Sequence, residues 1–119
     1  QIVQAGFNIQ SVTFDQVLSI DNQNLNPDSF FLGKPYPNPF NPSVEMNLLV
    51  NNSGTYQVNI HNIKGELINS WDVIFTQKGN HNIQWNAMNY SGSLVPSGVF
   101  FISVTNQNKS EQRKVLLLR

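Results

Sequence analysis

Apolar and polar residues alternate with a period of two through most of the chain after residue 44, with Gly, Asn, Ser and Pro between the alternating segments. This alternation is typical of β-strands that bury one face. It predicts strands over 44–50, 56–60, 67–75, 81–85, 99–105 and 111–119. No segment keeps the 3.6-residue apolar period of an amphipathic helix. Six short strands separated by turns predict an all-β fold, an immunoglobulin-like antiparallel β-sandwich.

The first third of the chain has a different character. Residues 1–20 hold short apolar alternations and predict an N-terminal strand segment, formed by Phe7, Ile9, Val12 and Phe14. Residues 21–29 are polar and rich in turn formers, which predicts a linker. We therefore expect a division into 1–20, 21–29 and a domain over 30–119, in which 1–20 is either the end of an upstream domain or an exchange arm.

The domain opens on a proline-rich segment. Four prolines fall within residues 35–42. Each fixes φ and removes a backbone donor, so the segment cannot be a central strand. We predict that residues 30–42 form an extended lead-in arm, with Tyr36 and Phe40 able to enter one apolar groove.

The last predicted strand is apolar on both faces, because four consecutive apolar residues run from Val115 to Leu118. Such a strand is normally covered on both sides, or keeps its second face for a partner. The sequence leaves both possibilities open.

Composition excludes several classes of function. Charged residues make up 12% of the chain, and seven basic residues balance seven acidic ones. A neutral surface of this kind does not suit nucleic acid or a polybasic membrane contact. Eighteen Asn and ten Gln supply the polarity instead. The chain has no cysteine, which excludes disulfides and thiolate metal sites.

No catalytic constellation is present in the sequence. The two histidines, His61 and His81, lack metal-ligand spacing, and the carboxylates are few and separated. We therefore expect no enzyme activity, cofactor, metal or small-molecule substrate. A carbohydrate-binding module would need exposed aromatics, whereas Trp85 and Phe101 are expected in the core and Tyr90 is undecided.

The proline-rich segment carries a family resemblance. Its residues resemble the opening motif of the C-terminal sorting domains of the bacterial type IX (Por) secretion system: Tyr36, Pro37, Asn38, Pro39, Phe40, Asn41 and Pro42. Later parts follow in the order of that family: Gly65, Trp85, Gly92, 96–101 and 114–119. The half from Trp85 to Phe101 is also similar to the immunoglobulin-like domain of flagellar hook-capping protein. One departure is Asn86, where relatives often carry Asp.

The resemblance implies a non-catalytic address on a secreted cargo protein of a Gram-negative bacterium. Outer-membrane secretion machinery would read it, a sortase-like peptidase would cut the linker, and the cargo would pass through the periplasm to the cell surface. Recognition would use the last strand and its neighbour. The partner-binding residues expected from this are Lys114, Val115, Leu116, Leu117, Leu118, Arg119, Pro96, Gly98 and Phe100.

A structural protein is the main alternative. The apolar alternation from Phe7 to Phe14 would suit a strand that completes the sheet of another copy of the chain. Head-to-tail contacts of this kind do not close, and they produce filaments.

Overall fold

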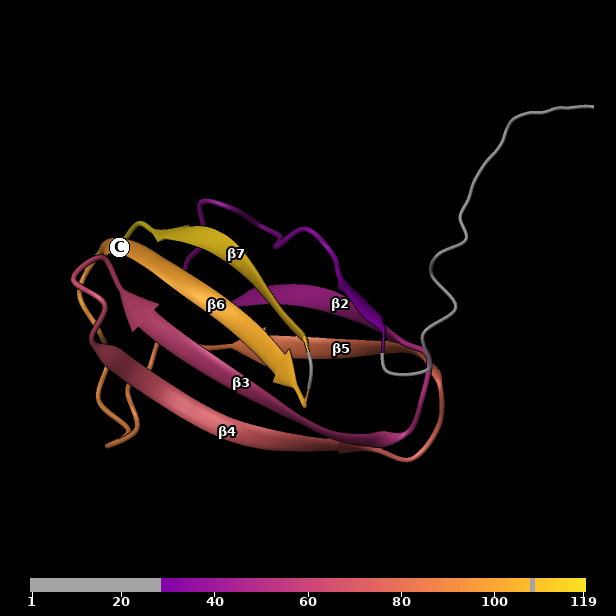
Figure 1. The fold of residues 1–119 in the computed structure, drawn as a ribbon. Helices are drawn as coiled ribbons and strands as arrows, with labels where there is room; N and C mark the ends of the chain where they lie inside the picture. Colours follow the sequence, from indigo (N-terminus) through magenta and orange to yellow (C-terminus); the bar gives the residue numbers. More distant parts are fainter. Residues whose placement is uncertain (1–28, 108) are drawn as a thin grey trace, which may run out of the picture.

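The computed structural model describes residues 29–107 and 109–119, which form seven strands and no helix (Figure 1). The expectations for 1–20 and for most of the linker lie outside the described residues. The strands pack as two layers. Their bounds are β1 (Phe30–Leu32), β2 (Val44–Val50), β3 (Gly54–Asn62), β4 (Leu67–Phe75), β5 (Gly79–Trp85), β6 (Gly98–Asn106) and β7 (Lys109–Leu117).

Both sheets are antiparallel. One has the order β1-β2-β5 and the other has the order β4-β3-β6-β7, so that β7 and β4 are the edges of the larger sheet. The predicted all-β immunoglobulin-like sandwich is confirmed. The six strands expected after residue 44 correspond to β2 through β7.

Alternation along each strand produces the core between the sheets. In β2, for example, the buried positions are every second residue from Val44 to Val50. Trp85 and Tyr56 are the largest fully buried side chains. Because every strand contributes one apolar face to this single layer, burial of these side chains is the main term that stabilises the fold.

Strand β1 was not expected from the sequence. Its three residues are the start of the predicted lead-in arm, and they pair with β2 as Phe30↔Val50, Phe31↔Leu49 and Leu32↔Leu48. A run of three residues followed by Gly and Pro is too short to show alternation. It forms a strand because β2 offers a free edge. The rest of that segment, residues 33–42, is called the proline arm below.

Candidate recognition surface at the terminal strand

The terminal strand β7 has two different faces. Val115 and Leu117 are fully buried in the core, whereas Leu118, just after the strand, is 52% exposed. Leu116 is half-buried on the outward face. The outward face is therefore left uncovered by the described residues at its apolar end.

The proline arm makes hydrogen bonds to the free edge of β7 along residues 114–118. The side-chain amide of Asn38 donates to the carbonyl oxygen of Lys114 at 3.1 Å and accepts from the backbone N–H of Leu116 at 3.0 Å. Phe40 continues the pattern with its backbone, donating to the Leu116 carbonyl at 2.8 Å and accepting from Leu118 N–H at 3.1 Å. Asn38 lies between two prolines that lack an N–H, so its side chain provides the bonds that a backbone would otherwise provide.

The two aromatic residues of the arm have different environments. Phe40 is 2% exposed and its ring lies 5.7 Å from that of Trp85, between centroids. Tyr36 is 49% exposed, and only its backbone is fixed, by two hydrogen bonds to Glu45. The two rings thus do not share a groove. Phe40 is the anchor that holds the arm against the core.

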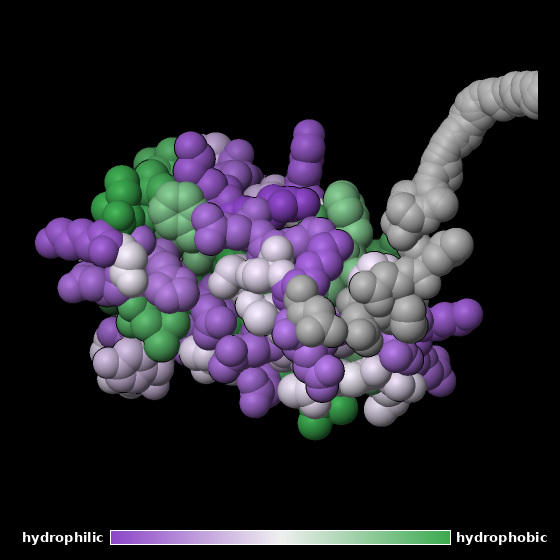
Figure 2. Space-filling model, in the orientation of Figure 1, coloured by the Kyte–Doolittle hydropathy of each residue, from purple (hydrophilic) through white to green (hydrophobic). Residues whose placement is uncertain are grey.

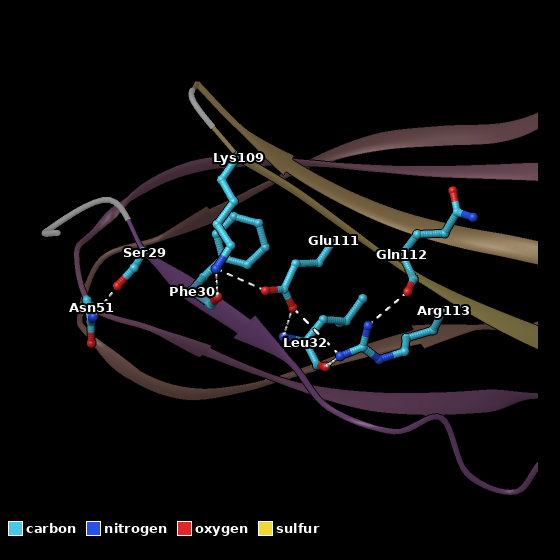
Figure 3. Close-up of polar contacts among 8 residues, drawn as sticks. All are labelled: Ser29, Phe30, Leu32, Asn51, Lys109, Glu111, Gln112 and Arg113. Carbon is cyan, nitrogen blue, oxygen red and sulfur yellow. Dashed lines mark hydrogen bonds and ion pairs between the residues drawn. The ribbon is translucent and has the colours of Figure 1, made fainter. Parts of the chain in front are cut away.

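Charged side chains of β7 hold β1 (Figure 3). Glu111 accepts from the backbone N–H of Leu32 at 2.8 Å, and Lys109 donates to the carbonyl oxygen of Phe30 at 2.8 Å. Arg113 donates to the Leu32 carbonyl oxygen. Lys109 and Arg113 also flank Glu111, at 2.9 and 3.7 Å. This set of contacts, called the clasp, occupies the outward edge of β1 with side chains.

Four apolar residues that are half-buried or exposed lie on the outer face where β6 begins and β7 ends. Val99 pairs with Leu116 and Phe101 pairs with Lys114 in the β6–β7 register. Val99, Phe101 and Leu116 are half-buried, and Leu118 extends the same face. Figure 2 shows apolar side chains at the end of the molecule where the C-terminus lies, while hydrophilic side chains dominate the middle of that face. We call Val99, Phe101, Leu116 and Leu118 the outer patch.

A pocket of about 330 Å³ adjoins the segment that begins β6. Pro96, Ser97 and Gly98 form one wall, and the exposed side chains of Ile63 and Leu94 form part of the rest. This pocket and the outer patch share Val99. The two adjoin at this residue, and the pocket lining also includes the polar residues Asn62 and Asn89.

The residues expected to bind a partner are thus distributed over three environments. Phe100, Val115 and Leu117 face the core. Arg119 is engaged with the chain's own loop, since its Nε donates to the Val95 carbonyl at 2.8 Å and its backbone N–H donates to Ser97 at 2.9 Å. The other members are on the surface or half-buried: Lys114, Leu116, Leu118, Pro96 and Gly98.

The aromatic residues divide between core and surface. Trp85 is 2% exposed, as expected, and Tyr90 is 74% exposed. The expectation of a core position for Phe101 is wrong, because β6 directs Phe100 inward and the next residue must then face outward. Trp71 is half-buried at the inner face of β4.

Within residues 29–107 and 109–119, no group of three or more His, Asp or Glu side chains is placed to hold a metal ion. His81 stacks on Phe75 at 4.1 Å between ring centroids, and its Nε2 lies 2.8 Å from the Gln77 carbonyl oxygen. The described part of the chain also holds no helix long and apolar enough to cross a membrane.

A scan against family models matches residues 40–110 to the FlgD Ig-like domain. The chain belongs to the FlgD Ig-like domain family. The matched range contains all of β2 to β6 and leaves out the residues before Phe40 and all of β7 after Ser110. No curated protein sequence matches this FlgD Ig-like chain.

Solved structures share the FlgD Ig-like fold of this chain. Dimeric latent PorU from Porphyromonas gingivalis matches with a TM-score of 0.62, 20% identity and 80% of this chain covered. PorZ, described as an essential surface component of the type IX secretion system of the same organism, matches with 0.52, 24% and 77%. The match spans only 10% of the PorU chain and 12% of the PorZ chain. At this identity the likeness shows the fold alone.

Proposed function

We propose that this chain is a non-catalytic C-terminal sorting domain that directs a cargo protein across the bacterial outer membrane to the cell surface through type IX secretion. Its partners are the outer-membrane secretion machinery and a sortase-like peptidase. The cargo protein reaches them through the periplasm. The observation that carries the proposal is the outer patch beside Lys114, on the strand where the family resemblance expects recognition.

The geometry favours recognition through a face and not through an edge. Along residues 114–118, the backbone groups at the edge of β7 that point away from β6 are already hydrogen-bonded to the proline arm. A partner strand therefore finds no open edge there. The apolar side chains of Leu116 and Leu118 are accessible, and desolvating such a patch stabilises a protein contact.

The proposed division of the chain follows from this role. Residues 1–20 end the cargo's preceding domain, 21–29 form the linker that the peptidase cuts, and 30–119 form the sorting domain. The clasp supports this division, since it fixes β1 from its first residue, Phe30. Ser29, the last residue of the linker, is bonded to Asn51 through its backbone carbonyl and its hydroxyl oxygen, so the tightly held part of the chain begins at the end of the linker.

The test attaches the full chain to the C-terminus of a secreted reporter in a bacterium that has a working type IX system. The double variant Leu116→Ser/Leu118→Ser is compared with Ile74→Ser, which removes an apolar side chain that is 72% exposed and lies on β4 of the same sheet. We expect surface delivery for the unchanged chain and for Ile74→Ser, and at least a tenfold loss for the double variant. Equal delivery of all three, or none by the unchanged chain, contradicts the proposal.

A second candidate is a subunit of an extracellular filament assembled by N-terminal strand exchange. One observation favours it. The backbone N–H and carbonyl of Glu45 both bond to Tyr36, so Glu45 makes no backbone hydrogen bond to its β5 partner Gln84. By the antiparallel alternation, the backbone groups of Asn80, Asn82 and Gln84 on β5 point away from β2. This edge has neither Pro nor Lys to block a strand. Sedimentation of the full chain tests it: concentration-dependent polymers abolished by Phe7→Asp/Phe14→Asp support the filament, and a monomer contradicts it.

A further inference from the structure

A polar cleft opens between the edges of the two sheets at β4 and β5. It has a volume of about 430 Å³ and is lined by Asn69, Trp71, Gln84, Trp85 and Asn86. Strand β4 is the edge of its sheet opposite to β7, so the cleft is separate from the outer patch. Its volume is within the range of pockets that bind small ligands or segments of larger ones.

One backbone carbonyl oxygen, that of Met88, holds two of the side chains that line the cleft. The carbonyl of Met88 accepts from the Trp85 indole Nε1 at 2.9 Å and from the Asn69 side-chain amide at 2.9 Å. The side chain of Asn69 also accepts from the backbone N–H of Ser70. These contacts tie the loop after β5 to both strands, so Asn69 and Trp85 are positioned before any ligand arrives.

Three polar groups on the other lining residues have no hydrogen-bond partner among the described residues. They are the Nε1–H of the half-buried Trp71 and the side-chain amides of Gln84 and Asn86. The backbone groups of Gln84 also face the open edge of β5. The cleft therefore offers free donors and acceptors beside an indole ring, and none of its lining residues is charged.

We propose that this cleft binds a neutral oligosaccharide. Hydroxyl groups donate and accept together, and a carboxamide does the same, so Gln84 and Asn86 match vicinal hydroxyls without a charge. The apolar C–H face of a pyranose ring suits the indole of Trp71. An anionic or cationic ligand would have no counter-charge in the lining. An extended peptide would need a long edge with side-chain pockets, whereas this cleft is lined by five residues at one end of the strands.

The test titrates the full chain with cellohexaose, mannohexaose and chitohexaose, and follows the side-chain amide and indole N–H signals by NMR. We expect at least one hexasaccharide to shift the signals of Trp71, Gln84 and Asn86. Gln84→Ala and Asn86→Ala should each weaken binding by about tenfold, because each removes a hydrogen-bonding group. Asn47→Ala is the matched control, since Asn47 is an exposed amide on β2 of the same sheet.

Folding does not confound this test, because Gln84 and Asn86 are exposed. Trp71→Phe keeps an aromatic ring while removing the free donor, and should also weaken binding. The proposal is overturned if no hexasaccharide binds at about 10 mM, or if binding is the same in Gln84→Ala, Asn86→Ala and the control. It is also overturned if a short alternating Thr–Val peptide shifts these signals and the saccharides do not.

Discussion

The side-chain carbonyl of Asn38 accepts a hydrogen bond from the backbone N–H of Leu116 at 3.0 Å, across 78 positions of the chain. The same side chain donates to the carbonyl oxygen of Lys114. A single side chain therefore acts as a short piece of strand along the edge of β7. This contact gives a physical role to the Asn of the proline-rich motif.

Replacing Asn38 by Ala removes both bonds and should lower the free energy of unfolding by about 1–3 kcal/mol. The Lys114 and Leu116 groups are near the surface, so water takes over part of the lost bonding. Asn41→Ala is the control, because Asn41 is exposed in the same arm. Urea unfolding of both variants checks this, and equal midpoints would contradict the assigned role of Asn38.

Phe40→Ala should be far more damaging than Tyr36→Ala. Phe40 is 2% exposed and contacts Trp85, so its truncation leaves a cavity and should cost about 3–5 kcal/mol. Tyr36 is 49% exposed and should cost less than about 1 kcal/mol. Thermal unfolding followed by tryptophan fluorescence distinguishes the two, and similar costs would mean that Phe40 does not anchor the arm.

Glu111→Ala should release β1 without unfolding the sandwich. The change leaves the backbone N–H of Leu32 without its acceptor and removes the carboxylate that pairs with Lys109 and Arg113. We expect a loss of about 1–3 kcal/mol and faster amide exchange at Leu32. Asp72→Asn serves as the comparison, because it alters an exposed carboxylate on β4. Unchanged exchange at Leu32 in Glu111→Ala would show that the clasp does not hold β1.

Replacement by Ser should change the free energy of unfolding very differently at two neighbouring leucines, the last residue of β7 and the residue after it. Leu117 is fully buried, so Leu117→Ser should cost more than about 3 kcal/mol. Leu118 is 52% exposed, and Leu118→Ser should change stability by less than about 0.5 kcal/mol. Denaturant unfolding of the pair measures this directly. A large cost for Leu118→Ser would mean that its side chain is covered in the native state.

The sequence was informative where a local pattern decides the structure. Alternation located β2 to β7, because each of these strands buries one face for at least seven residues. It could not locate β1, whose three residues form a strand only through contacts with β2 and with Lys109, Glu111 and Arg113. Phe101 was misplaced because two adjacent phenylalanines give no sign of which one faces inward.

The candidate site shows the same limit. The last strand was chosen from its apolar residues and from the family resemblance, but the choice between its faces required the β6–β7 register. The role of Asn38 also had no local signal, since its bonding partners lie 76 and 78 positions away. The cleft at Trp71 and Gln84 has residues from separate strands and separate sheets.

The bonds between the proline arm and β7 also constrain the order of folding. Hairpins such as β3–β4 join strands that are close in sequence and can form early. The arm bonds to residues 76 and 78 positions downstream, so its docking depends on β6–β7 being in place. A chain that has not yet acquired residues 114–118 keeps Asn38 unbonded and Phe40 without its backbone partners. The arm can therefore dock only after residues 114–118 are present and paired.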